Sequence, residues 1–270
     1  MKDEDRRRKI SNLVEANKSL LPELLHDIQV RRNKVRIGSV LIGLSRRAHA
    51  LAIYNYFVGN DIALFKQNMY LATRLNLASI GESGGASFDT GEPIIVALLS
   101  DNDEVIQKVA RAETADLIKY RNDPLSNFSH VYMLQLAIRG DDDQISRMIE
   151  KIAKNGKKPL RTECAEGRDF YSLLLKSDKT GLESLIQLKH APLNSADPID
   201  EDFLSYLGVL EAKLCWRRGI PVEIDHPLVP MELMPVKPLD HYDDVYDFLK
   251  PGWVPPPQGL IGRVSRWFKT

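Results

Sequence analysis

The most conspicuous candidate for chemistry is a serine flanked by glycines. Residues Gly81-Glu82-Ser83-Gly84-Gly85 match the Gly-x-Ser-x-Gly nucleophile elbow, in which a strand turns sharply into a helix and exposes the serine hydroxyl. The segment before this motif, 62–77, has the apolar spacing of a helix, and no alternating β/α pattern follows it. We therefore expect Ser83 to lie in a flexible loop and not to act as a nucleophile.

A second motif lies a few residues further along the chain. Phe88-Asp89-Thr90-Gly91 resembles the motif of aspartic proteases, whose chemistry pairs two carboxylates that share a proton. The sequence holds no second copy of this motif and no β-rich context for it. A simpler interpretation is that Asp89 or Thr90 caps the helix that begins near Pro93.

Potential metal ligands do not follow a known spacing. The six histidines form no pair with a cysteine or a second histidine at metal-ligand spacing. Asp101-Asn102-Asp103-Glu104 begins like a calcium loop, but its sixth position is Ile106, where a glycine is required. Helix capping and a solvated turn account equally well for Asp141-Asp142-Asp143. We expect no catalytic residue, no metal and no cofactor, and hence a protein that is not an enzyme.

Composition indicates a globular protein that does not bind nucleic acid. Of its 270 residues 43% are hydrophobic and 27% charged, and 37 basic side chains balance 37 acidic ones. Binding to a phosphate backbone requires a net positive surface, so nucleic acid is not the expected partner. The charges are nevertheless segregated, since residues 1–50 hold 12 Lys or Arg and 6 Asp or Glu, whereas residues 192–250 hold 5 and 12.

Cysteine usage and apolar stretches point to a cytoplasmic protein. Cys164 and Cys215 are the two cysteines, and the apolar helix pattern around Cys215 favours a buried thiol over a disulfide. The first residues are strongly charged and lead into no apolar signal-peptide segment. The longest apolar stretches are too short to span a bilayer.

Four similar turns indicate a helical repeat. In each turn a short apolar helix pattern is followed by Gly or Ser, then by Asp or Asn, and then by another helical pattern. The Gly or Ser positions are 59, 100, 140 and 177, separated by 41, 40 and 37 residues. Gly or Ser suits the end of one helix, and Asp or Asn accepts hydrogen bonds from the free N–H groups of the next. The sequence predicts an all-α fold of stacked antiparallel helical hairpins with a repeat period of about 40 residues.

The rest of the chain is assigned around this repeat. We expect N-terminal helices in 1–78, a flexible Gly/Ser loop in 79–92, the hairpin repeat region in 93–250 and a proline-rich tail in 251–270. The N-terminal helices are placed at 20–32, 40–57 and 62–77. A last long helix is expected to begin near Asp200 and to stop at Gly219. An extended proline-rich segment follows, with at most a short strand at 222–224 and a short helix at 242–249.

The C-terminal half carries a family resemblance. Its residues are Glu211-Ala212-Lys213-Leu214-Cys215-Trp216-Arg217-Arg218-Gly219, Val222-Glu223-Ile224-Asp225-His226-Pro227-Leu228-Val229-Pro230, Leu233-Met234-Pro235, Pro238-Leu239-Asp240, Tyr242 and Tyr246-Asp247-Phe248-Leu249. This run, together with Ala97-Leu98-Leu99-Ser100-Asp101 upstream, resembles the immunity protein 49 family, which bacteria make beside polymorphic toxins. The resemblance covers roughly residues 90–250, and the first 80 residues and the tail match less well.

The resemblance implies a neutralising protein that binds one toxin and covers or distorts the toxin's active site. It implies a cognate protein toxin that acts in the cytosol, as in toxin–antitoxin systems of bacterial competition, and it brings no catalytic residue. The competing interpretation is a helical-repeat scaffold or regulatory protein-binding module with no toxin partner, because stacked hairpins commonly form concave binding surfaces. An enzyme on a helical-repeat fold, such as a DNA glycosylase, is a third class. It would need a basic groove, whereas the repeat turns here are acidic.

Two acidic groups are the candidate partner contacts. Toxins that attack nucleic acids or phosphorylated cofactors need a basic active site, so an acidic face on the inhibitor favours binding. The first group lies in the repeat turns and comprises Asp101, Asp103, Glu104, Asp141, Asp142 and Asp143. The second group lies near the C-terminus and comprises Asp240, Asp243, Asp244 and Asp247. Helix capping explains about one carboxylate in each turn, and a solvated helix face is the alternative for the second group.

Overall fold

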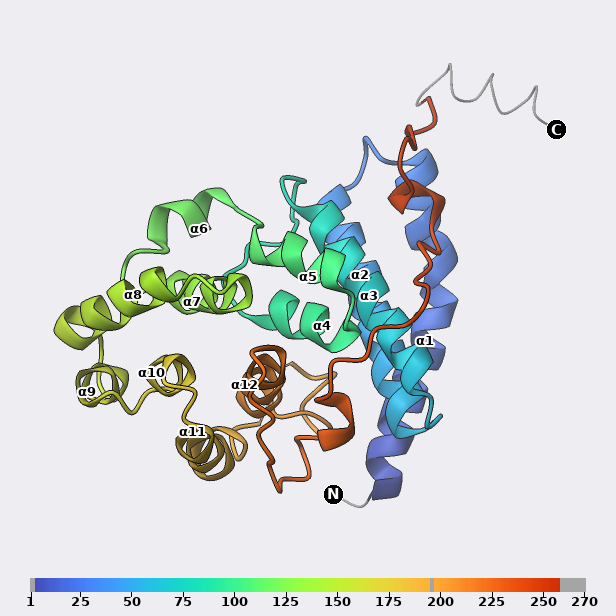
Figure 1. Ribbon diagram of the computed structural model, residues 1–270. Coiled ribbons are helices and arrows are strands. Elements are labelled where there is room, and N and C mark those ends of the chain that lie inside the picture. The colour runs from blue at the N-terminus through green and yellow to red at the C-terminus, as the bar shows by residue number, and fades with distance from the viewer. Residues whose placement is uncertain (1–2, 195–196, 258–270) are drawn as a thin grey trace. The chain divides into compact units, whose positions relative to one another are not determined.

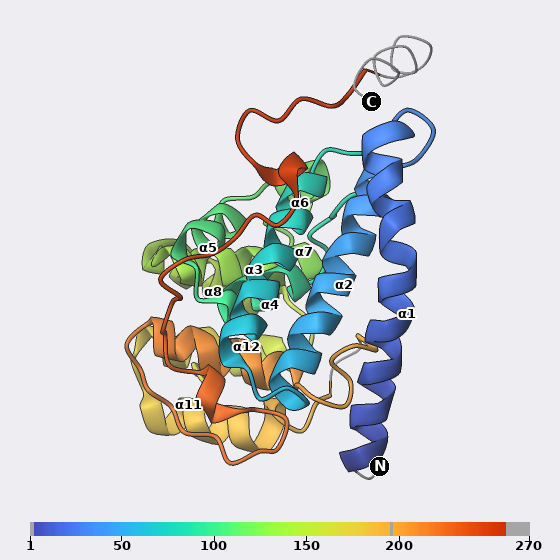
Figure 2. The ribbon, with the colours of Figure 1, turned by 90° about the vertical axis from the view of Figure 1, so that its right-hand side faces the viewer.

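The computed structural model describes residues 3–194 and 197–257 (Figures 1 and 2). Every regular element in this part of the chain is a helix, which confirms the all-α prediction. The chain's described residues divide into two compact units, one formed by 3–86 with 240–257, and the other by those between 87 and 239. The division falls inside the predicted loop 79–92. None of the described helices combines the length and the apolar character needed to cross a bilayer.

Three long helices form the first unit: α1 (Asp3–Val30), α2 (Ile37–Phe57) and α3 (Ile62–Ser79). They lie side by side, with α2 in contact with both of the others (Figure 2). The helix expected at 20–32 therefore starts much earlier. Ile10 and Val14 are buried, because they occupy one face of α1 four residues apart. This short apolar stripe indicates a helix within the otherwise strongly charged N-terminal sequence.

The four predicted turns each separate two helices and share one backbone design. A residue with positive φ ends the first helix, at Asn60, Asp101, Gly140 and Ser177. The next residue caps the following helix, at Asp61, Asn102, Asp141 and Asp178, and its side chain accepts a backbone N–H from that helix. The Asp or Asn cap is confirmed at all four turns. The residue with positive φ is the expected Gly or Ser only at Gly140 and Ser177, whereas at the other two turns it is the following residue, Asn60 or Asp101.

The second unit is built from shorter helices. They are α4 (Glu92–Ser100), α5 (Asp103–Ala110), α6 (Ala115–Tyr120), α7 (Asn127–Arg139), α8 (Asp142–Asn155), α9 (Leu160–Glu166), α10 (Phe170–Leu175), α11 (Lys179–Leu185), the π-helix η1 (Ile186–His190), α12 (Tyr206–Arg217) and the 3₁₀ turn η2 (Met231–Leu233). The last of the long helices, α12, contacts α4, α7 and η1 (Figure 1). It therefore packs the C-terminal part of this unit against α4, its first helix.

Helix α12 begins later than the sequence suggests. The acidic residues near Asp200 form turns, and the first helical residue is Tyr206. Ser205 is the N-cap and its hydroxyl accepts the N–H of Gly208. A hydroxyl cap fits the N-terminus as well as the expected carboxylates do. At the other end the helix stops before Gly219, as predicted, and Gly219 has φ +76°.

The proline-rich segment after α12 is extended, but the described residues contain no strand there. Its backbone is held by side chains instead of by a neighbouring strand. The indole N–H of Trp216 donates to the carbonyl of Val222 at 2.9 Å. The N–H groups of Glu223 and Asp225 donate to Glu183 Oε1 and Gln187 Oε1. Because these contacts satisfy the backbone, the short strand considered at 222–224 is not needed.

The expected helix at 242–249 is wrong except for its last turn, the 3₁₀ turn η3 (Asp247–Leu249). The backbone of this segment bonds sideways to α3. Gln67 exchanges two hydrogen bonds with the backbone of Asp243, and Arg74 donates to the carbonyl of Leu249. These side chains occupy backbone groups that a helix would need.

Within the first unit, the part of the Gly/Ser loop up to Ala86 packs closely against the start of α2. A Cβ at Gly38, in the first turn of α2, would lie 2.2 Å from the backbone nitrogen of Gly85, a distance that real Cβ atoms do not show. The hydroxyl of Ser79 accepts the N–H of Ala86. The glycines of the elbow-like motif therefore serve a close backbone approach. Ser83 is exposed and follows a helix, which is not the context of a nucleophile elbow.

Candidate binding cavity

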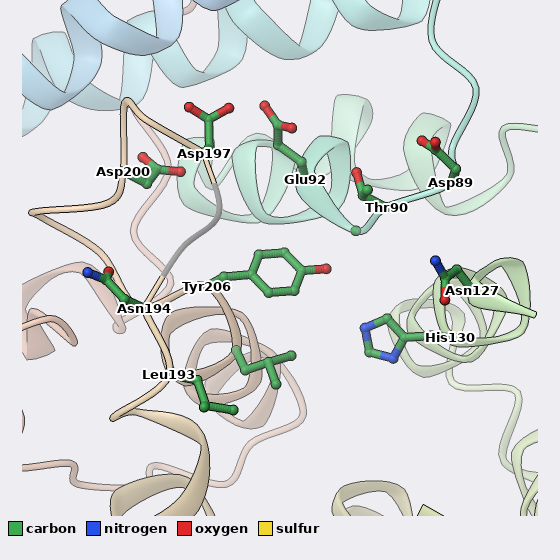
Figure 3. Close-up of a pocket in the computed structure, with 12 residues that line it drawn as sticks. Asp89, Thr90, Glu92, Asn127, His130, Leu193, Asn194, Asp197, Asp200 and Tyr206 are labelled. Carbon is green, nitrogen blue, oxygen red and sulfur yellow. The ribbon is translucent and has the colours of Figure 1, made fainter. Parts of the chain in front are cut away.

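The second unit contains a cavity of about 470 Å³ (Figure 3). Four segments that are distant in sequence supply its walls: the entry to α4, the start of α7, the stretch before α12 and the first residues of α12. The lining residues are Asp89, Thr90, Gly91, Glu92, Asn127, His130, Leu193, Asn194, Asp197, Asp200, Tyr206 and Leu207. A volume of this size suits a small ligand or a single large side chain.

The cavity is acidic. Asp89, Glu92, Asp197 and Asp200 line it, and none of the other lining residues is a lysine or an arginine. Asp197 and Asp200 lie on one side of the cavity and Asp89 on the other, with Glu92 between them (Figure 3). Among the described residues no group of three or more His, Cys, Asp or Glu side chains is placed to hold a metal ion. The negative charge is spread around the wall, an arrangement that matches an extended organic cation.

Tyr206 crosses the middle of the cavity (Figure 3). Burial raises the pKa of its phenol to about 12, and a backbone hydrogen bond from Gly91 opposes this shift. The phenol is therefore neutral at physiological pH and its ring offers an aromatic surface next to the carboxylates. An aromatic face beside carboxylates can hold a cation through both charge and the ring quadrupole.

Gly91 is the position where a methyl group would test this arrangement. It is the residue before α4, with φ −83°, a value that any residue adopts. A Cβ there would lie 2.2 Å from Tyr206 Oη and 2.9 Å from Leu134 Cδ1. We expect Gly91→Ala to lower the free energy of unfolding by about 1–3 kcal/mol through overpacking.

The control for this prediction is the same substitution in a Tyr206→Phe background. Without the hydroxyl, the nearest atom of residue 206 is the ring carbon Cζ, 3.3 Å from the added methyl group. The cost of Gly91→Ala should then fall by at least about 1 kcal/mol in a chemical-denaturation double-mutant cycle. Additive effects would mean that the methyl group and the phenol do not compete for the same space.

His130 faces the cavity from α7 (Figure 3). Burial lowers the pKa of its imidazole to about 4, and the nearby His190 adds to this shift. His190 is paired with Glu211, whose Oε2 lies 2.5 Å from Nδ1. The imidazole of His130 is therefore neutral at pH 7, so it can donate or accept a hydrogen bond without adding positive charge to the cavity.

This shift predicts a pH dependence of stability. Between the ordinary histidine pKa of 6.5 and the folded value of about 4, the unfolded chain binds more protons at His130 than the folded one. Stability is therefore lost as pH falls through this window, by up to about 3 kcal/mol. Replacement by glutamine removes the titrating group. The difference in unfolding free energy between wild type and His130→Gln should change across pH 6.5 to 4 and stay constant above pH 7; a flat difference throughout would contradict the assignment.

The acidic residues of the repeat turns lie outside this cavity, and most serve the fold. Asp101 is fully buried and its Oδ1 lies 2.7 Å from Lys213 Nζ, so a partner cannot reach it, and it is wrong as a surface contact. Asp103 pairs with Arg217 and Glu104 with Lys108, and both carboxylate oxygens of Asp142 accept from Nη2 of Arg218. Asp141 caps α8, and Asp143 is exposed in its first turn.

The C-terminal acidic group is divided in the same way. Asp244 is half-buried against α3, where it accepts from Arg74 and from the hydroxyl of Tyr70. Asp243 contacts Gln67 through its backbone and His241 through its carboxylate. Asp247 pairs with Lys250, and Asp240 is exposed. The exposed members of both groups are accessible to a partner, whereas Asp244 stabilises the first unit.

The cavity itself was not apparent in the sequence. The sequence predicts that Asp89 or Thr90 caps α4, but the N-cap is Gly91, which has no side chain. Asp89 instead accepts a hydrogen bond from Ser87 and lines the cavity. Asp200 was assigned to the start of a helix. These residues lie in segments around 90, 128 and 200, and no spacing rule links such positions.

No family model, curated protein or solved structure was found to match this chain. The likeness to the immunity protein 49 family therefore stays a prediction that rests on the residues of the C-terminal half.

Proposed function

We propose that this protein is an immunity protein, a binding protein without catalytic activity that neutralises a cognate bacterial toxin by covering or distorting the toxin's active site. The acidic cavity of the second unit is the observation that carries the proposal. Four carboxylates around an aromatic side chain form a receptor for a cationic side chain. A toxin that acts on nucleic acids or phosphorylated cofactors in the cytosol presents such side chains at its active site.

The occupant proposed for the cavity is an arginine or lysine side chain of the toxin. Its apolar stem would lie along Leu193, Leu207 and the ring of Tyr206, and its charged end would face the carboxylates. Arginine suits the site better, because its planar guanidinium pairs with carboxylates in a two-pronged way and stacks on aromatic rings.

The residues of the family resemblance have a structural role that is compatible with this proposal. Trp216 and Lys213 hold the extended segment after α12 through hydrogen bonds to backbone carbonyls. Tyr242 packs against Tyr70 of the first unit, with ring centroids 5.0 Å apart. The shared residues would then maintain the scaffold, and the toxin contacts would lie on faces that differ between relatives.

The proposal also takes the helix pairs at the four turns as stacked antiparallel hairpins with a period of about 40 residues. Its support is the common design of the turns, with a positive φ followed by an Asp or Asn cap at each. Repeats of this kind present their loops as a continuous surface for a partner.

Capture of the partner is the direct test. The tagged protein is purified from its native host and the bound protein is identified, then co-expressed with and without this chain. We expect a toxin that stops growth when expressed alone and is silenced by an approximately stoichiometric amount of this protein. Recovery of an ordinary cellular protein, with no effect on growth, would favour the scaffold interpretation instead.

A further inference from the structure

A second cavity in the same unit has the opposite charge. It measures about 340 Å³ and lies where α5 ends, α6 ends and α7 passes. Its lining residues are Arg111, Ala112, Glu113, Arg121, Tyr132, Gln135 and Arg139. Three guanidinium groups thus face a single carboxylate, in a chain whose overall formal charge is zero.

The end of α5 explains why two of the arginines are held in place. The last carbonyls of a helix have no partner inside it and carry partial negative charge. Gln135, which is buried, donates to the carbonyls of Val109 and Ala112. Arg139 donates to the carbonyl of Ala110, and Arg111 to that of Gln107 at 3.2 Å. Both guanidiniums are therefore tethered to the end of α5 before any ligand arrives.

Tyr132 contacts two of the three arginine side chains within the cavity. The guanidinium carbon of Arg121 lies 5.2 Å from the centroid of the Tyr132 ring, and that of Arg139 lies 5.9 Å from it. Arg121 also pairs with Glu113 at 2.6 Å. Within the part of the chain that the structure describes, each of the three arginines makes one side-chain hydrogen bond, although a guanidinium carries five N–H donors. Further donors on each guanidinium can therefore bind a ligand.

We propose that this cavity binds a tetrahedral oxyanion, namely phosphate or the phosphate group of a small phosphomonoester. Guanidinium forks match the oxygen pairs of such an anion and bind them through charge-assisted hydrogen bonds. The guanidiniums of Arg111 and Arg139 are tethered by backbone carbonyls, and that of Arg121 lies over the ring of Tyr132. Together they form a preorganised site for this anion. Glu113 pairs with Arg121 through one nitrogen, Nη1, and competes with the anion.

The test uses inorganic phosphate and a simple alkyl phosphate as probes, with binding to the full chain followed by isothermal titration calorimetry and ³¹P NMR. Wild type is expected to bind phosphate with a dissociation constant of about 1 mM or below. Arg111→Gln, which changes an exposed side chain, should weaken binding about tenfold, and Arg139→Gln by at least as much. Glu113→Gln should strengthen binding severalfold, because it frees Arg121.

The matched control is Arg168→Gln, which removes an exposed arginine of the same unit that pairs with Glu166 away from the cavity. It should leave phosphate affinity unchanged. Tighter binding of the alkyl phosphate than of phosphate would identify a phosphorylated small molecule as the natural ligand, and the reverse order would identify the free anion. The proposal is overturned if wild type binds neither probe, if acetate at equal ionic strength binds equally well, or if Arg111→Gln and Arg168→Gln reduce affinity equally.

Discussion

Replacing Lys213 by methionine is expected to lower the free energy of unfolding by about 3–5 kcal/mol. The ammonium group of Lys213 is fully buried and pairs with the equally buried carboxylate of Asp101 at 2.7 Å. It also donates to the carbonyls of Leu233, Met234 and Pro235, at 2.7 to 3.3 Å. Methionine keeps the length and apolar stem of the side chain. The substitution therefore removes the charge and its hydrogen bonds and leaves a buried carboxylate without its cation.

The double variant Lys213→Met/Asp101→Asn separates this explanation from a general packing defect. Asparagine is neutral and its side-chain oxygen can still accept the N–H of Lys237, which bonds Asp101 at 3.2 Å. Part of the lost stability should therefore return in the double variant. The surface pair of Glu104 and Lys108 is the matched control, and Glu104→Gln should cost less than about 1 kcal/mol. Chemical denaturation gives the stabilities. A cost of Lys213→Met no greater than that of the surface variant would show that the buried pair does not hold the fold.

The same substitution should loosen the extended segment before the rest of the unit. Three consecutive carbonyls of this segment accept from the Lys213 ammonium group. The N–H of Lys237, two residues further on, donates to the carboxylate of Asp101, the partner of Lys213. Faster amide hydrogen exchange at 231–237 in Lys213→Met, at a temperature where the helices remain protected, is the expected result.

Reversing two carboxylates of the acidic cavity is expected to weaken toxin binding by on the order of 100-fold. The variant is Asp89→Lys/Glu92→Lys, which changes one exposed and one half-buried side chain of the lining. Each lysine would place a like charge against the cationic side chain that the cavity is proposed to hold. Asp200 is left unchanged because it is almost fully buried and its replacement would endanger the fold.

The control variant has the same change in net charge at another place. Asp142→Lys/Asp143→Lys alters the first turn of α8, outside the cavity lining, and tests the repeat-turn group at the same time. Affinity and association rate for the captured toxin are measured at low and high salt. The cavity variant should lose both affinity and salt sensitivity, whereas the control should lose neither. If the α8 variant is the one that weakens binding, the toxin contacts the repeat turns and the cavity proposal is wrong.

The sequence by itself determined the helical class and the local chemistry of the turns. Residues 59–61, 100–102, 140–141 and 177–178 carry the information for a helix end and a cap within a few positions, so no tertiary contact is needed to interpret them. The end of α12 at Gly219 belongs to the same kind of local signal. Apolar periodicity also located α2 and α3 to within a few residues, because the buried side chains recur at helical spacing.

The tertiary structure determined those parts of the fold in which hydrogen bonds from side chains distant in sequence replace local ones. The segment from Tyr242 to Leu249 has a helical apolar pattern, yet Gln67 and Arg74 of α3 bond its backbone and leave a single 3₁₀ turn. Asp101 has the composition of a surface turn residue, and it is buried because Lys213, more than a hundred positions away, lies opposite it. Neither partner can be identified from the residues that surround the other in sequence.

Both cavities are also features that only the tertiary structure determines. The acidic one joins segments near 90, 128 and 200, and the basic one joins the ends of α5 and α6 to the middle of α7. Their residues have ordinary local roles, since Asp89 accepts a hydrogen bond from the hydroxyl of Ser87 and Arg139 is the last residue of α7. Charge of one sign accumulates at each place only because helix packing brings those side chains together. The spacing of the charged residues along the sequence does not predict that packing.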